Sequence, residues 1–411
     1  MKKLVSLALG VMTALGGFVD LGQIVFTMQA GALFRYSLLW VIAVGLVAIV
    51  IYMEMCGRIA AVARVPVFRC VRLRLSKPLG FMTLIASNLL NLLTCAAELG
   101  AIGILLHLMT GWNERATLVA AIALLAVFIW ISKLQWIERV FGLTGLLMIL
   151  FAVSAYYLQP NWSEVLAGFL PSSPSGDSHR QALYAYFAVG IFSAMLMEYE
   201  VHFYSSGAIE EGWKEDSLGE NVIVASLGCT FGAVLTCALL VLGALVFLPR
   251  AIFPDSISVA VMPAALPFTS TAVTVAIVGI LACVGGAAVE TALSGAYNVC
   301  QFYNIKWGKN RRVRDAKTFT LIWVAMLLVA AVLALSGLRP LTLVNFAIIF
   351  GMVVLPFTYY PILKLAGDRT MMGRHANGPI YQAIGWIVFV LVTVAAIAAI
   401  PLAVMTNVGR P

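Results

Sequence analysis

Ionisable side chains stand in the middle of apolar runs of this sequence. Asp20 lies within the first run, in Phe18-Val19-Asp20-Leu21-Gly22-Gln23, while Glu198, Glu200 and His202 fall within five residues of one another in the sixth. A carboxylate at bilayer depth costs roughly 2.5–3.5 kcal/mol on insertion scales, so its presence there indicates a function. Carboxylate oxygens, together with backbone carbonyls freed where a spanning helix unwinds, suit a hard cation such as Mg²⁺.

A structural role for the two glutamates is the alternative. Glu198 and Glu200 could form a buried ion pair or face a solvated vestibule. No Lys or Arg lies near them within the first or the sixth run. A cation site on Asp20 and one or both glutamates is therefore the preferred interpretation.

Other polar residues at membrane depth could carry protons. Glu98 in the third run and Glu290 in the eighth have three alternative roles: a proton carrier, a neighbour of the site or a charge in a vestibule. His202 could titrate near neutral pH or be a satisfied structural histidine. Glu54 precedes Arg58 by four residues, the spacing of a helical ion pair.

The elements that must position these residues are membrane-spanning helices. With 62% hydrophobic residues, 11% charged residues and a mean hydropathy of +1.00, the 411 residues describe an all-α polytopic membrane protein. About eleven apolar runs are long enough to span, and they lie near 4–27, 36–57, 82–107, 117–132, 140–159, 182–206, 221–248, 271–299, 318–336, 341–365 and 383–405.

The net charge of +8 is explained by its distribution. With a cytoplasmic N-terminus and alternating sides, 20 of the 26 Lys and Arg fall inside, which predicts an extracellular or periplasmic C-terminus. The basic loops 58–77 and 306–317 then determine topology and contact anionic lipid of the bilayer, so a nucleic-acid partner is not expected. The seven cysteines lie mostly in apolar runs without a CxxC motif, and we expect free, buried thiols.

A Pro- and Ser-rich stretch divides the chain into two halves of five spans each. An odd number of spans per half turns the second half upside down in the membrane, as in an inverted repeat. We therefore predict a first repeat over 1–160, an extracellular linker over 161–181, a second repeat over 182–366, and a cytoplasmic loop with a peripheral eleventh span over 367–411.

Short segments along most of the chain resemble the Nramp divalent-metal transporter family. Their order and spacing carry the resemblance, and the segments are Tyr52-Met53-Glu54 to Arg58, Ile137-Glu138-Arg139-Val140, Pro160-Asn161-Trp162 to Pro171, Ser294-Gly295-Ala296-Tyr297 with Gln301, and Leu355-Pro356-Phe357 to Leu363 with Asp368-Arg369, Met372-Gly373 and Asn377. The resemblance implies a LeuT-type 5+5 inverted repeat with helices 1 and 6 unwound at the midplane.

Both signature motifs of the family are altered here. Asp20-Leu21-Gly22-Gln23 corresponds to its Asp-Pro-Gly-Asn, and Met197-Glu198-Tyr199 to its Met-Pro-His. By this match Asp20 is the principal metal ligand, Gln23 and Glu198 bind directly or through water, Met197 offers a thioether, and Gly22 and Ala194 mark the unwound backbone. A later family histidine corresponds to Tyr204, and an acidic residue of the third span to Cys95, while Glu98 is kept.

These departures resemble those of the Nramp-related magnesium transporters. The sequence thus predicts a multi-pass inner (plasma) membrane transporter that takes up Mg²⁺, and also Mn²⁺, without strict proton coupling, because several positions that the family uses for protons are lost. Glu98, Glu200, His202, Tyr204 and Glu290 stay as candidates for coupling or for a vestibule. No cofactor and no obligatory protein partner are expected.

Three alternatives remain open at this point. A proton-coupled Mn²⁺/Fe²⁺ symporter would keep the fold and change the substrate. An organic-cation or amino-acid carrier would pair an amine with Asp20 and Glu198. An enzyme is the weakest alternative, since the sequence has no P-loop, metalloprotease motif or nucleophile–base constellation.

Overall fold

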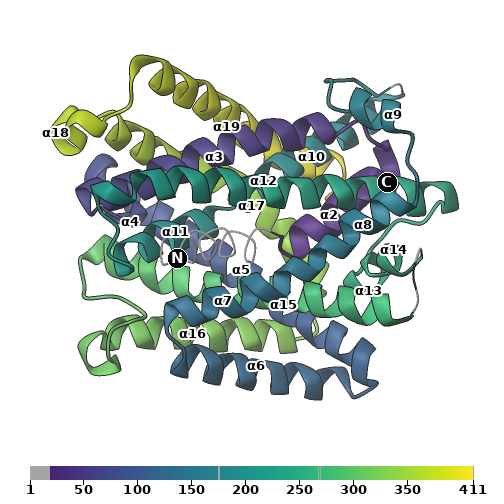
Figure 1. The fold of residues 1–411 in the computed structure, drawn as a ribbon, viewed down its shortest axis with the longest axis horizontal. Helices are drawn as coiled ribbons and strands as arrows, with labels where there is room; N and C mark the ends of the chain where they lie inside the picture. Colours follow the sequence, from purple (N-terminus) through teal and green to yellow (C-terminus); the bar gives the residue numbers. More distant parts are fainter. Residues whose placement is uncertain (1–18, 175, 267, 269, 411) are drawn as a thin grey trace.

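The fold is a bundle of long helices, shown as a ribbon in Figure 1. The computed structural model describes residues 19–174, 176–266, 268 and 270–410, and these contain no β-strand. The helices run over α2 Leu21–Phe34, α3 Leu39–Ala63, α4 Val67–Arg74, α5 Lys77–Thr110, α6 Glu114–Ile131, α7 Leu134–Gly145, α8 Ile149–Tyr157, α9 Trp162–Ala167, α10 Ser178–Met195, α11 Glu198–Glu210, α12 Leu218–Leu242, α13 Ile257–Ala260, α14 Met262–Ala265, α15 Ser270–Tyr303, α16 Lys317–Leu335, α17 Pro340–Ala366, α18 Arg369–Met372 and α19 Pro379–Met405.

Ten helical segments of the described chain are long and apolar enough to cross a membrane. They correspond to the second to eleventh predicted runs, with α7 and α8 forming one span and α10 and α11 another. Most of the first run, 4–27, lies outside the described residues. Its described part, α2, ends at Phe34 instead of residue 27, because Gln29 is accommodated inside the bundle by a 2.7 Å hydrogen bond to the carbonyl of Pro254.

Close backbone contact fixes α2 against α12. A Cβ on Gly31 would lie 2.1 Å from the carbonyl oxygen of Leu240, and a Cβ on Gly243 would lie 2.3 Å from that of Met28. Lipid tails are as apolar as side chains, so helices in a membrane associate through such close packing at small residues. The contact sets the rotation of α2 and therefore the direction in which its side chains point.

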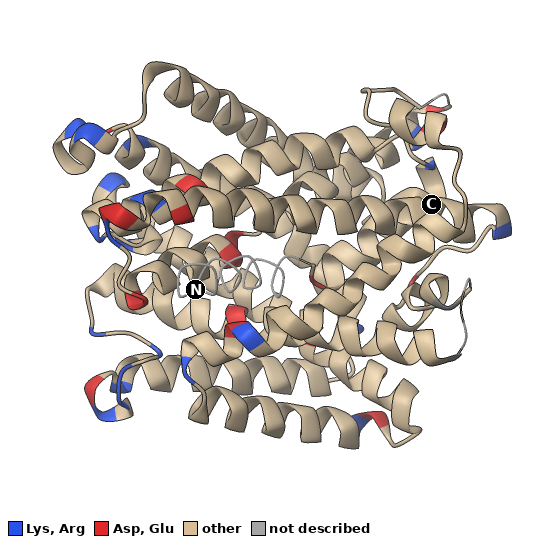
Figure 2. Ribbon diagram, viewed as in Figure 1, with Lys and Arg blue, Asp and Glu red and all other residues tan. Residues whose placement is uncertain are grey.

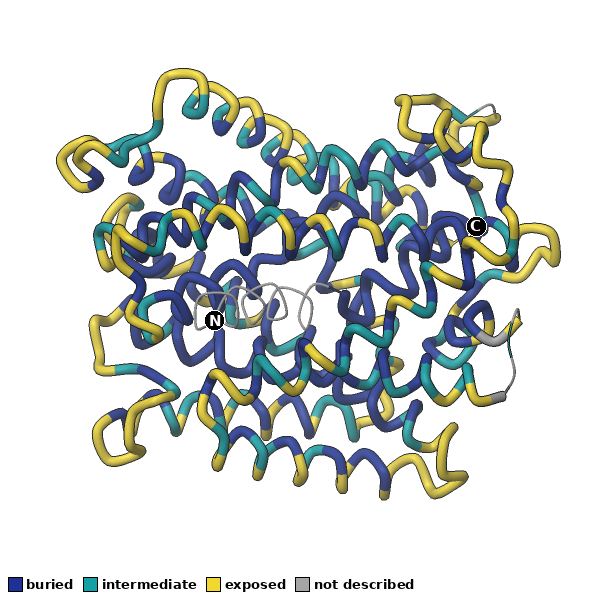
Figure 3. Tube along the Cα trace, in the orientation of Figure 1, coloured by how far each residue is buried: buried dark blue, intermediate teal, exposed yellow. Residues whose placement is uncertain are grey.

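Buried helices form the centre, and less buried spans lie outside it. Within the centre, α5 packs against α15 and α17, and α10 packs against α2 and α3. Figure 3 shows continuous burial there and exposed residues along the outer helices. The outer spans are α6, the α7–α8 span, α16 and α19, whose apolar faces are largely exposed. This agrees with a peripheral position for the last span.

The charges divide between the two ends of the bundle. Figure 2 shows most Lys and Arg at the end that carries α4 and α18, with the C-terminus at the opposite end. The predicted excess of basic residues on one side is thus seen in three dimensions. The linker predicted over 161–181 contains the short helix α9, and the seven cysteines are free. The division into two inverted halves at these boundaries stays a prediction.

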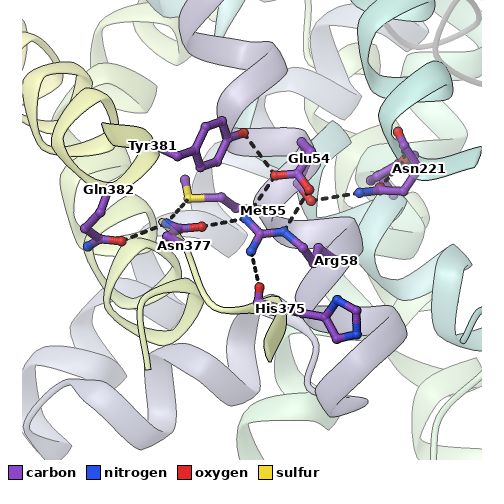
Figure 4. Close-up of polar contacts among 9 residues, drawn as sticks. Glu54, Met55, Arg58, Asn221, His375, Asn377, Tyr381 and Gln382 are labelled. Carbon is purple, nitrogen blue, oxygen red and sulfur yellow. Dashed lines mark hydrogen bonds and ion pairs between the residues drawn. The ribbon is translucent and has the colours of Figure 1, made fainter. Parts of the chain in front are cut away.

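A polar network joins α3 to the segment before α19 at the basic end (Figure 4). The predicted pair is confirmed, because Arg58 Nε lies 2.8 Å from Glu54 Oε1 and Arg58 Nη2 lies 3.0 Å from Oε2. Arg58 also donates to the carbonyl of His375 and to Asn377 Oδ1, and Tyr381 donates to Glu54 Oε2 at 2.9 Å. The network fastens the last span to the bundle.

Candidate functional site

The sixth span, Ser178–Glu210, is broken near the middle of its length. Helix α10 ends at Met195, Leu196 and Met197 leave the helical path, and α11 begins at Glu198. The predicted unwinding of this span is confirmed. In the first span, α2 begins at Leu21 with Asp20 as its N-cap, while the preceding half of that span lies outside the described residues.

A small cavity of about 40 Å³ lies at this break. It brings together Asp20, Ala194, Met197 and Glu198, four of the six residues predicted to bind a metal. The remaining walls come from α5, α10, α11, α17 and the break itself, and the residues are Leu90, Thr94, Ser193, Leu196, Tyr199, Val344, Ala347, Ile348, Gly351 and Leu355.

Both carboxylate oxygens of Asp20 accept hydrogen bonds. Oδ1 accepts from the backbone N–H of Gln23 at 2.7 Å, which is the N-cap bond of α2. Oδ2 accepts from the Tyr199 hydroxyl at 3.2 Å, and the same hydroxyl lies 3.2 Å from Met197 Sδ. The hydroxyl thus stands between a carboxylate and a thioether that one ion could otherwise contact together.

Glu198 is held by residues that do not line the cavity. Its Oε1 accepts a 2.5 Å hydrogen bond from the Ser87 hydroxyl, and His202 Nε2 lies 3.5 Å from the same oxygen. Its Oε2 has no hydrogen-bond partner in the described part of the chain. A buried carboxylate oxygen in this condition is costly unless a cation, a proton or water satisfies it.

Two predicted ligands do not line the cavity. The Gln23 amide donates to Thr236 Oγ1 at 2.8 Å and to Met195 Sδ at 3.2 Å, so its side chain is directed to α12 and α10. We had expected Gly22 to mark unwound backbone. This prediction was wrong, because Gly22 lies inside the first turn of α2. The N-terminal turn of α2 is regular because Asp20 caps it.

Helix ends set the electrostatics of the site. The last turn of α10 leaves carbonyls without intrahelical partners, and Ala194 of that turn lines the cavity, so this end favours a cation. The N-termini of α2 and α11 carry the opposite sign. Acidic residues compensate them, since Asp20 caps α2, Glu98 Oε1 accepts the Leu21 N–H at 3.0 Å, and Glu198 opens α11.

The coupling candidates occupy separate places around the site. Glu98 holds the start of α2, and neither oxygen of the buried Glu200 has a hydrogen-bond partner among the described residues. Glu290 is buried on α15, and its Oε2 is also without a partner there. His202 packs edge-on against Phe68. The Tyr204 hydroxyl donates to Asn221 Oδ1 at 2.8 Å, away from the cavity.

Sequence reasoning selected Glu98 of α5 but missed the polar residues that precede it on the same helix. Ser87, Asn91, Thr94 and Glu98 follow the spacing i, i+4, i+7 and i+11, which places them along one face of a helix, and all four are buried. Ser87 binds Glu198, Thr94 lines the cavity and Glu98 binds α2. This stripe of polar residues in an apolar run was the sequence signal that could have predicted the contribution of α5 to the site.

The described residues contain no group of three His, Cys, Asp or Glu side chains that could enclose a metal. An ion in the cavity would therefore rely on two carboxylates, backbone carbonyls and water. Such an open donor set suits an ion in transit better than a permanently bound one. A bundle with a broken span beside a buried cavity that holds two carboxylates is the arrangement expected of a LeuT-type membrane transporter.

Comparison with known proteins gives the family. The profile of the natural resistance-associated macrophage protein-like family, Nramp, matches residues 10–401, and the chain belongs to this family. The divalent metal cation transporter MntH of Levilactobacillus brevis is 24% identical over 403 residues, which cover 92% of this chain and 85% of that protein.

Solved structures agree on the fold. The manganese transporter of Eremococcus coleocola superposes with a TM-score of 0.77 at 19% identity, over 98% of this chain and 87% of that one. MhsT, solved in complex with L-phenylalanine, gives a TM-score of 0.65 at 18% identity, over 97% and 98% of the two chains. The LeuT-type fold predicted from the sequence is confirmed.

Proposed function

We propose that this protein carries divalent metal cations across the membrane, with Mg²⁺ as the principal substrate and Mn²⁺ as a second one. Membership in the Nramp family and the description of the Levilactobacillus brevis relative as a divalent metal cation transporter support this class of substrate. The observation that carries the proposal is the placement of Asp20 and Glu198 in one buried cavity at the break of the sixth span.

The size and chemistry of the cavity favour Mg²⁺. One water needs about 10–15 Å³ of such volume, so 40 Å³ holds about three waters or an ion with part of its hydration shell. Mg²⁺ dehydrates reluctantly and binds through one or two carboxylates while keeping several waters. Asp20 would act as the principal ligand, and Glu198 would bind directly or through water.

Uptake needs no strict proton coupling in this proposal. Tyr199, Tyr204 and Cys95 stand where the sequence resemblance places ionisable residues of the ordinary family. Moving two charges down an inward-negative potential of 100 mV releases about 4.6 kcal/mol, at about 2.3 kcal/mol per charge. We place the protein in the plasma membrane with the basic end in the cytoplasm and the C-terminus outside.

Alternating access would come from the broken spans. The α10 and α11 segments meet at Leu196 and Met197, which lie outside both helices and would act as a hinge. Movement of α2, α10 and α11 against the other spans would open the cavity first to one side and then to the other.

One observation favours a second candidate, a proton-coupled Mn²⁺/Fe²⁺ symporter. Met197 lines the cavity beside Asp20, and a thioether is a soft ligand that prefers transition metals to Mg²⁺. Proton influx that parallels Mn²⁺ uptake would support this candidate. An amino-acid or organic-cation carrier is less well supported, since 40 Å³ has no room for such a molecule in this conformation.

Flux into liposomes tests the proposal. Wild type, Asp20→Ala and Glu198→Ala are assayed in parallel with Mg²⁺, Mn²⁺ and Ca²⁺, with and without a pH gradient. Glu215→Ala is the matched control, because Glu215 is an exposed carboxylate that pairs with Arg374 far from the cavity. We expect both cavity variants to lose transport and the control to keep it. Normal transport by both cavity variants would refute the site.

A further inference from the structure

A second cavity, of about 230 Å³, lies at the basic end between α6 and α16. Four basic residues line it, Lys133, Lys309, Arg311 and Arg312, and no acidic residue of the described chain does. Two tryptophans, Trp130 and Trp323, form its apolar side, with ring centroids 6.1 Å apart. A concentration of positive charge beside an aromatic wall requires an explanation that cation transport does not give.

The walls of this cavity are held in place. The Glu210 carboxylate accepts the backbone N–H groups of Lys309 and Asn310 at 2.6 and 2.8 Å, and Asn310 Oδ1 accepts the N–H of Leu134. Lys309 Nζ donates to the carbonyl of Ser132 at 2.7 Å. The loop between α15 and α16 is thereby fastened to the turn between α6 and α7, so the cavity is preformed.

Three of the four bases are free to bind an anion. Lys133, Arg311 and Arg312 are exposed, and none of them makes an ion pair within the described part of the chain. Arginine guanidinium groups bind phosphate oxygens in a bidentate manner, and lysine acts as a point charge. The free bases therefore have the chemistry of a phosphate site.

The position of the cavity points to the bilayer as the source of that phosphate. It lies where α6 ends at Ile131 and just before α16 begins at Lys317, which is the level of the membrane–water boundary. Helices α6 and α16 pack side by side at the edge of the bundle (Figure 1), and their apolar faces are largely exposed to lipid. Tryptophan is enriched at this boundary because its ring is amphipathic.

We propose that this cavity binds the headgroup of an anionic phospholipid from the cytoplasmic leaflet. The phosphate lies on Arg311, Arg312 and Lys133, and the glycerol and first acyl carbons lie on Trp130 and Trp323. The site is separate from the cation cavity, and the inference does not depend on which ion is transported. A bound lipid joins α6 to α16 at the edge of the bundle.

Lipid binding to the full-length, detergent-solubilised protein tests the proposal. Phosphatidylglycerol, phosphatidylcholine and inorganic phosphate are titrated, and bound lipid is measured by native mass spectrometry. At about 1 kcal/mol for each basic residue near an anionic surface, R311Q/R312Q should weaken phosphatidylglycerol binding about 30-fold. The matched control is K306Q/K317Q, which removes the same charge from the connection and from the first residue of α16, both outside the cavity.

The aromatic wall distinguishes a lipid from a soluble anion. Trp130→Ala should weaken phosphatidylglycerol binding and leave the binding of inorganic phosphate unchanged. An equal loss in K306Q/K317Q would show a general charge effect, and displacement of phosphatidylglycerol by inorganic phosphate with no effect of Trp130→Ala would show a soluble-anion site. Either result overturns the proposal. If R311Q/R312Q does not fold, the Trp130→Ala and phosphate measurements still decide it.

Discussion

The Tyr199 hydroxyl gives a prediction with a definite sign. It lies 3.2 Å from Asp20 Oδ2 and 3.2 Å from Met197 Sδ, in the space that an ion bound to both groups would occupy. Direct ligation of a divalent ion by both groups therefore requires the hydroxyl to move. Replacing Tyr199 with Phe keeps the ring and removes the competing hydroxyl, so cation affinity should increase.

The magnitude follows from the hydrogen bond that is lost. A hydrogen bond to a charged group contributes about 1.5–3 kcal/mol. At 3.2 Å the contact is long for an O–H···O bond, so the lower value, about 1.5 kcal/mol, is appropriate. An ion that no longer displaces this bond gains that amount, which corresponds to roughly tenfold tighter binding.

Isothermal titration of detergent-solubilised protein with Mg²⁺ and Mn²⁺ measures the change. Tyr359→Phe is the matched control, because Tyr359 is buried and its hydroxyl has no hydrogen-bond partner among the described residues. The control should keep the wild-type affinity. Unchanged or weaker binding in Tyr199→Phe would refute the reasoning, and weaker binding would indicate that the hydroxyl is itself a ligand.

Further predictions concern stability, measured as the thermal unfolding midpoint in detergent. Glu54→Ala breaks the largely buried ion pair of Figure 4 and should cost about 3 kcal/mol, whereas an exposed pair would cost under about 1. Gly31→Ala places a Cβ 2.1 Å from a carbonyl oxygen of α12 and should cost about 1–3 kcal/mol. Hydrogen bonds from Thr370 and Arg74 lower the pKa of Asp368 to about 2, so its stabilising effect is complete above about pH 4 and is lost as the pH falls towards 2. Asp368→Asn should therefore lower the midpoint at pH 7 and reduce its decline between pH 4 and 2.

The fold was predictable because membrane spans leave strong signals in a sequence. Twenty apolar residues and a bias of basic loops are enough to place helices and two ends, and the second to eleventh runs correspond to observed spans. The ends of the spans were predicted less accurately where a polar side chain forms a hydrogen bond inside the bundle. The predicted first run ended too early, at residue 27, because Gln29 looked too polar for a span. The sequence does not show that the Pro254 carbonyl accepts a hydrogen bond from the Gln29 amide.

Part of the cavity was also predictable from the sequence. Asp20 and Glu198 could be selected because a charge in an apolar run is costly, and the structure places both in the same cavity. Gln23 could not be placed, because its direction depends on the rotation of α2. That rotation is fixed by contacts of Gly31 and Gly243 with backbone far away in the sequence.

The two carboxylates of the cavity differ in how readily they can receive an ion. Both oxygens of Asp20 already accept hydrogen bonds, whereas Glu198 Oε2 has no partner among the described residues. In the proposed transport, an arriving cation would therefore meet Glu198 first and keep the part of its hydration shell that the cavity of about 40 Å³ has room for. Contact with Asp20 would come second, because it requires the Tyr199 hydroxyl to leave. This order would suit an ion that gives up water slowly, so the arrangement of Asp20, Tyr199 and Glu198 supports the proposal of Mg²⁺ over an ion that needs the thioether of Met197 from the start.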